Sequence, residues 1–123
     1  MLIWIFGDVQ KNVTNLLERD KAAGYLELEN ARIRWYLSLD YNDLPVQAKE
    51  SGQRTSRSII IDDEEFEFSE GFSNLHTLTY KKILAGEGYR LEESKKSIET
   101  VYTIRNARPV GLKGYYHPIL KNL

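Results

Sequence analysis

Residues 31–39 read Ala-Arg-Ile-Arg-Trp-Tyr-Leu-Ser-Leu, an alternation that decides the fold class of this chain. A period of two residues is typical of a β-strand with one buried face, so we predict a strand here. One face is apolar and carries Ile33, Trp35, Leu37 and Leu39. The opposite face is polar and is either solvated or packed on another subunit. That polar face makes three residues candidates for an interface: Arg32, Arg34 and Tyr36.

Strand signals continue before this stretch. Residues 25–29 also alternate, and Glu29-Asn30 predicts a tight hairpin because Asn tolerates a positive φ. Residues 9–19 fit either a helix or a strand, and we interpret them as a strand followed by a turn at residues 20–24.

A second hairpin is predicted further along the chain. Residues 58–61 and 64–68 are short strands, and Asp62-Asp63 forms the two-residue turn between them. Gly71 then ends the return strand. Residues 40–53, which contain Pro45 and Gly52, are expected to be a polar connection.

Helices are predicted mainly in the second half. Ser73 is a candidate N-cap for a helix that ends near Gly86. A second helix spans about residues 92–107, because acids occupy its first turn and Pro109 follows its last. Residues 111–123 are expected to lie extended on the surface.

Strands followed by helices indicate an α+β fold. We therefore predict an open, largely antiparallel sheet of five to six strands, with helices on one face and the other face available for oligomerisation. At 123 residues, the chain is expected to be a single domain, residues 1–123.

The composition excludes several classes of function. The formal net charge of −1 argues against a nucleic-acid partner, since such proteins usually carry an excess of basic residues. The chain has no cysteine, which excludes disulfides and thiolate zinc sites and is compatible with the cytoplasm. We expect no metal site, because the acidic hairpin at residues 62–67 divides its oxygens between two faces.

The chain starts with an apolar run, Met1 to Phe6, that has neither a cap nor an acidic first turn. The run is too short for a membrane span and has no basic leader of a signal peptide, so we expect no membrane association. We interpret it as a helix stopped by Gly7, cut from a larger protein.

Two groups of residues are candidates for ligand contacts. His76 and Tyr80 are one helical turn apart near a helix start, where free N–H groups favour anions. Arg54 and Arg57 bracket a donor-rich loop suited to carboxylate or phosphate. The simpler interpretations are a histidine packed on a tyrosine and an exposed loop that balances nearby acids.

Nucleotide-binding motifs are missing from the sequence. The segment Gly86-Glu87-Gly88 follows a predicted helix and lacks the Lys-Ser/Thr of a phosphate loop. No Gly-x-Gly-x-x-Gly sequence occurs, so the chain has no dinucleotide-binding unit of its own.

Several segments, spread over nearly the whole chain, form a pattern together. They are residues 26–35, 37–40, 57–59, 66–72, 75–80, 83–86 and 97–99. Together they resemble the C-terminal domain of a known family, the Gfo/Idh/MocA oxidoreductases. Within that family the chain is most similar to sugar-nucleotide 3-dehydrogenases of bacterial lipopolysaccharide biosynthesis, which act on UDP-N-acetylglucosaminuronic acid.

The resemblance implies a parent NAD-dependent dehydrogenase of the cytoplasm. Its N-terminal Rossmann domain would hold NAD, and its catalytic Lys and His would precede Met1, so the fragment would contain no catalytic residue and be inactive alone. The implied ligand is a UDP-sugar, contacted by Arg54, Arg57, His76 and Tyr80. The implied assembly is a dimer or tetramer formed through the sheet face.

An alternative hypothesis stays open. The chain could be a standalone, non-catalytic interaction module that self-associates through its sheet face. A small hydrolase is less favoured, because no nucleophile–base pair is visible in the sequence.

Overall fold

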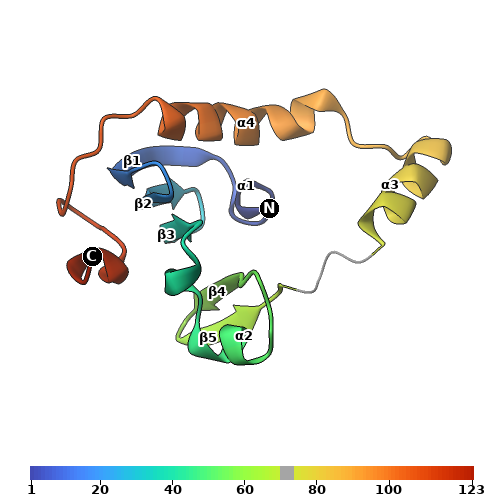
Figure 1. Cartoon of the computed structure of the whole chain (residues 1–123). Helices are drawn as coiled ribbons and strands as arrows, with labels where there is room; N and C mark the ends of the chain where they lie inside the picture. Colours follow the sequence, from blue (N-terminus) through green and yellow to red (C-terminus); the bar gives the residue numbers. More distant parts are fainter. Residues whose placement is uncertain (70–73) are drawn as a thin grey trace. The chain divides into compact units, whose positions relative to one another are not determined.

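A computed structural model describes residues 1–69 and 74–123 (Figure 1). The chain divides into two compact units. The first unit consists of Met1–Leu39 and Arg90–Leu123, and the second of Asp40–Tyr89.

The first unit is built on a three-stranded antiparallel sheet in the order β1-β2-β3. Its strands are β1 (Val9–Leu17), β2 (Lys21–Leu28) and β3 (Arg32–Ser38). The predicted strand at residues 31–39 and the hairpin before it are therefore confirmed. Residues 9–19 are a strand, as interpreted, but the predicted turn at residues 20–24 is wrong because β2 already begins at Lys21.

A close approach in this sheet explains why glycine occurs inside β2. Gly24 pairs with Trp35 of β3, and the indole ring of Trp35 lies over the position where a side chain would stand. A Cβ atom on Gly24 would overlap the Val13 carbonyl oxygen and lie only 2.7 Å from the ring. The glycine that suggested a turn is thus a packing requirement of the sheet.

Two helices accompany the sheet. Helix α1 (Leu2–Phe6) ends as predicted at Gly7, which has φ of 88°. Helix α4 (Leu91–Arg105) follows the course of β1 (Figure 1), and β1 is the strand that it contacts most. Acidic residues in its first turn and Arg105 in its last complement the helix dipole.

The C-terminal segment differs from the prediction of an extended surface tail. Its backbone joins the free edge of β1, because the amides of Val110 and Gly111 donate to the carbonyls of Thr14 and Asn15. A 3-10 helix, η2 (Pro118–Lys121), then buries Leu120 to 9% exposure. The Gly-rich, aromatic composition of residues 111–123 gave no local signal for these contacts with β1.

The second unit contains short elements. They are η1 (Tyr41–Asp43), α2 (Val46–Glu50), β4 (Ser58–Ile61), β5 (Glu64–Glu67) and α3 (Leu75–Leu84). The β4–β5 hairpin is confirmed, and both turn residues, Asp62 and Asp63, have positive φ. The predictions for Gly71 and Ser73 lie outside the described residues.

The mixed, antiparallel α+β class is confirmed, but the expected sheet of five to six strands is wrong. Residues 9–38 form one sheet of three strands, and residues 58–67 form a separate sheet of two. The physical reason is that residues 58–61 and 64–67 pair with each other across a two-residue turn. The turn alone sets their register, so the hairpin forms without a further strand.

Little apolar surface is buried among the described residues. The buried apolar side chains are Ala23, Tyr25, Leu26, Leu28, Ala48 and Leu120. Large side chains on α3 and α4 remain exposed instead. No helix in the described ranges is both long and apolar enough to cross a bilayer.

Candidate functional site

The arginine loop lies between α2 and β4 of the second unit. Its end is fixed to the residues that follow β5, because the backbone N–H of Arg57 donates to Ser69 Oγ at 2.8 Å. The carbonyl of Arg57 also accepts the amide of Phe68 at 2.9 Å. The loop therefore has an anchored backbone while the side chains of Arg54 and Arg57 are exposed, an arrangement suited to an anionic ligand.

A carboxylate beside this anchor is ionised more readily than usual. The backbone N–H of Ser69 donates to Glu67 Oε1 at 2.8 Å. Hydrogen bonds from Ser69 lower the pKa of Glu67 below its ordinary value. Ser69 thus connects the arginine loop to a negative charge at the end of β5.

Helix α3 carries the other predicted ligand residues. His76 and Tyr80 are four residues apart on this helix, and both side chains are exposed. The residue that precedes the helix, Asn74, has φ of 67° and makes no side-chain cap. The structure places the two predicted pairs on separate elements of one unit, and their role in binding stays a prediction.

The predicted interface residues share one face of β3, as the alternation indicated. Arg34 pairs with Tyr25 of β2, and Tyr36 pairs with Ala23. Arg32 and Arg34 are exposed, whereas Tyr36 is half-buried and its ring stacks on His117 at 5.9 Å. The C-terminal segment therefore covers part of the face that the sequence suggested was open.

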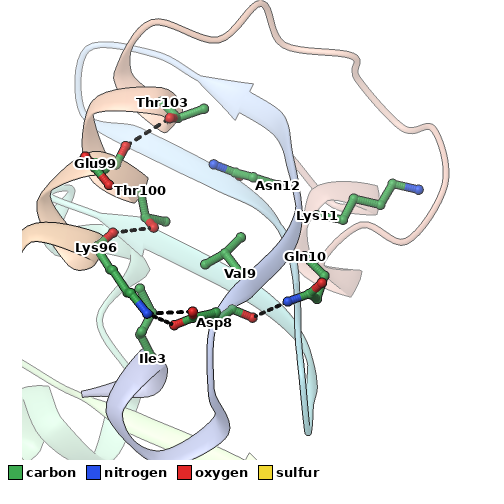
Figure 2. Close-up of a pocket in the computed structure, with 10 residues that line it drawn as sticks. All are labelled: Ile3, Asp8, Val9, Gln10, Lys11, Asn12, Lys96, Glu99, Thr100 and Thr103. Carbon is green, nitrogen blue, oxygen red and sulfur yellow. Dashed lines mark hydrogen bonds and ion pairs between the residues drawn. The ribbon is translucent and has the colours of Figure 1, made fainter.

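Figure 2 shows a groove of the first unit that sequence reasoning did not identify, of about 420 Å³. Lys96 Nζ reaches from α4 to both oxygens of Asp8, at 2.8 and 2.6 Å. This pairing raises the pKa of Lys96. Because 88 residues separate the partners, no local sequence signal could have revealed the contact.

Most polar groups of the groove are used within the protein. The hydroxyls of Thr100 and Thr103 donate to carbonyls of their own helix, both at less than 3 Å (Figure 2). The Oδ1 atom of Asn12 is buried without a hydrogen-bond partner. The polar contacts of the groove therefore attach α4 to β1. Among the described residues that line it, we find no catalytic arrangement of acid, base and nucleophile.

The described residues do not fit a dinucleotide cofactor. Binding of NAD in a Rossmann unit needs parallel strands joined by a helix, with the pyrophosphate at the helix N-terminus. Both sheets described here are antiparallel. Within residues 1–69 and 74–123, no group of three His, Asp or Glu side chains could hold a metal ion.

Comparison with solved structures finds this fold in part of a dehydrogenase that was crystallised with NAD. The chain is similar to the WlbA (WbpB) dehydrogenase from Thermus thermophilus, in its crystal structure with NAD and alpha-ketoglutarate. The identity is 42% and the TM-score 0.88, over 96% of this chain and 38% of that one. The structure of the same dehydrogenase with NAD and UDP-GlcNAcA matches at 40% identity, with a TM-score of 0.87.

These matches confirm the resemblance predicted from the sequence. No protein-family model matches the chain. The chain spans 38% of the length of the dehydrogenases that it matches.

Proposed function

We propose that this chain is the C-terminal, substrate-side domain of an NAD-dependent dehydrogenase that oxidises C3 of a UDP-N-acetylated uronic acid. The observation that carries the proposal is identity of 40% over 96% of the chain to a dehydrogenase crystallised with NAD and UDP-GlcNAcA. Its place would be lipopolysaccharide or O-antigen biosynthesis in the cytoplasm.

In the proposed enzyme, NAD and the substrate would be bound mainly by different domains. The antiparallel sheets do not fit NAD, so the cofactor would be held by a Rossmann domain elsewhere in the same protein. This chain would contribute cationic and hydrogen-bonding contacts to the substrate, and the isolated chain would be inactive.

A direct test uses the purified chain with NAD and UDP-GlcNAcA. We expect no NADH absorbance above that of a sample without protein. The same assay on a protein that joins this chain to the reading frame upstream of Met1 should produce NADH. Turnover by the chain alone, or none by the joined protein, would contradict the proposal.

Arg57 is the residue that we propose for the uronate carboxylate, because its backbone is anchored while its side chain is exposed. In the joined protein, Arg57→Ala should raise KM for UDP-GlcNAcA about tenfold, the loss of one charge-assisted hydrogen bond. KM for UDP-N-acetylglucosamine, whose sugar lacks the carboxylate, should change much less.

Controls separate this role from a general loss of charge. Arg57→Lys keeps the charge but loses the two-pronged geometry, so its KM should lie between those of wild type and Arg57→Ala. Arg19→Ala removes an exposed arginine from the β1–β2 turn and should leave both KM values unchanged. An equal effect of Arg57→Ala on both substrates would reject a carboxylate role.

The other predicted contacts are included in the proposal. Arg54, His76 and Tyr80 would bind the nucleotide or sugar, and a face with Arg32, Arg34 and Tyr36 would pack on another subunit of a dimer or tetramer. Alanine variants of the first group should change KM, whereas variants of the second should change the oligomeric mass in light scattering.

The alternative function, a self-associating module without catalysis, is favoured by the exposed apolar side chains of α3 and α4. It predicts concentration-dependent self-association of the chain and a true start codon at Met1. The dehydrogenase proposal predicts instead that the reading frame continues upstream into a strand–turn–helix with a Gly-x-Gly-x-x-Gly motif.

A further inference from the structure

Residues 110–121, here termed the C-terminal strap, contact the first unit in several places, one of them the stacking of the Tyr115 ring on Tyr25 of β2 at 5.2 Å. Two other attachments hold its ends. The first attachment is at β1, where the Asn15 side chain donates to the carbonyls of Gly111 and Lys113 at 2.8 and 3.1 Å. Asn15 is 2% exposed, so this end of the strap is held by a buried amide.

The second attachment is at His117. Its ring stacks on Tyr36 of β3 at 5.9 Å, with 30° between the planes. Its Nδ1 atom accepts the backbone N–H of Ile119 at 3.3 Å, which begins η2 and positions the buried Leu120. The imidazole thus links the end of the strap to the sheet and to its own helix.

This contact requires a neutral imidazole. Nδ1 accepts a hydrogen bond only when the ring proton is on Nε2, and a protonated ring has no acceptor atom. Arg34, on the same face of β3 as Tyr36, would also repel the new charge. In the part of the chain that the structure describes, no carboxylate compensates that charge.

We propose that His117 is a proton-controlled latch, which holds the end of the C-terminal strap on the sheet when neutral and releases residues 117–121 when protonated. Release would uncover the ring of Tyr36 and the side chain of Leu120. The proposal concerns the first unit alone and does not depend on the proposed dehydrogenase activity.

The direction of the pH dependence follows from the environment of the ring. Burial, and secondarily Arg34, lower the pKa of His117 below 6.5. The released state therefore binds the proton more tightly than the latched state. The latch is fully stable above about pH 6.5 and is lost as the pH falls below that value.

Hydrogen exchange of the whole chain, measured between pH 8 and 5 and corrected for intrinsic exchange rates, tests the latch. Protection of the Ile119 and Leu120 amides should fall by up to about tenfold per pH unit below pH 6.5, the limit for one proton. Amides of β2 should keep their protection, which separates strap release from unfolding.

Variants make the test specific. His117→Gln stays neutral, so strap protection should become independent of pH whatever its level. His76→Gln removes the other, exposed histidine and should leave the wild-type pH dependence. Arg34→Gln should raise the pKa of His117 in an NMR titration. Protection that does not change while His117 titrates, or a pH dependence that persists in His117→Gln, would overturn the proposal.

Discussion

Replacement of Asn15 by alanine tests the long-range anchor of the strap. The Asn15 amide makes two hydrogen bonds, to the carbonyls of Gly111 and Lys113. At about 1 kcal/mol for each net hydrogen bond, Asn15→Ala should lower the free energy of unfolding of the first unit by up to about 2 kcal/mol. The loss is partly offset because the buried Asn15 Oδ1, which has no hydrogen-bond partner, is removed as well. Both acceptor residues are exposed, so water can hydrate their carbonyls and limit the loss.

The measurement is urea unfolding followed by fluorescence, because both tryptophans, Trp4 and Trp35, belong to the first unit. Asn12→Ala is a matched control on the same strand. The Oδ1 atom of Asn12 has no hydrogen-bond partner, so its removal should change stability by less than about 0.5 kcal/mol.

A third variant tests the chemistry of the anchor. Asn15→Asp places a carboxyl group beside two carbonyl oxygens and should destabilise more than alanine at neutral pH, because the unfolded chain ionises the acid freely whereas the buried site disfavours its charge. Equal losses for Asn15→Ala and Asn12→Ala, or an aspartate variant as stable as wild type at neutral pH, would refute the anchor.

Three further outcomes follow from the structure. Gly24→Ala should destabilise the first unit by about 1–3 kcal/mol in urea unfolding, since the new Cβ would overlap the ring of Trp35; a neutral effect would contradict the close approach. Asp63→Gly should stabilise the β4–β5 hairpin by up to about 1 kcal/mol, because glycine adopts the φ of 67° without strain; slower amide exchange in β4 would demonstrate it. Lys96→Met should cost less than about 1 kcal/mol, since the ion pair with Asp8 is exposed, and the cost should shrink in high salt.

Sequence patterns predicted correctly those elements that depend only on residues close together in the chain. The alternation at residues 31–39 identified β3, and Asp62-Asp63 identified the turn of the second hairpin. The polar connection at residues 40–53 instead contains η1 and α2. The Asp40 side chain caps η1 by accepting a hydrogen bond from the amide of Asn42. The aspartate is a capping signal, but a helix of three residues is too short to be recognised from a sequence pattern.

Contacts between distant residues could not be predicted. The bond from Asn15 to Lys113 spans 98 residues, and the pairing of Lys96 with Asp8 spans 88. For the candidate ligand residues, the sequence showed only which residue types are present and how far apart they are along the chain. Arg57 received its backbone anchor from Ser69, a residue on the far side of the second hairpin.

Asn15 occupies a special position in the ladder between β1 and β2. Thr14 pairs with Gly24 and Leu16 pairs with Ala23, so Asn15 is an extra residue in a β-bulge. Removal of this one residue would make the ladder regular between Thr14 and Leu16 and leave the pairings on either side in place, while the second irregularity, between Val9 and Lys11, would remain. Among descendants of a common ancestor, a one-residue deletion here should therefore be tolerated by the sheet, and it should occur together with C-terminal ends that are shorter or that diverge freely in sequence.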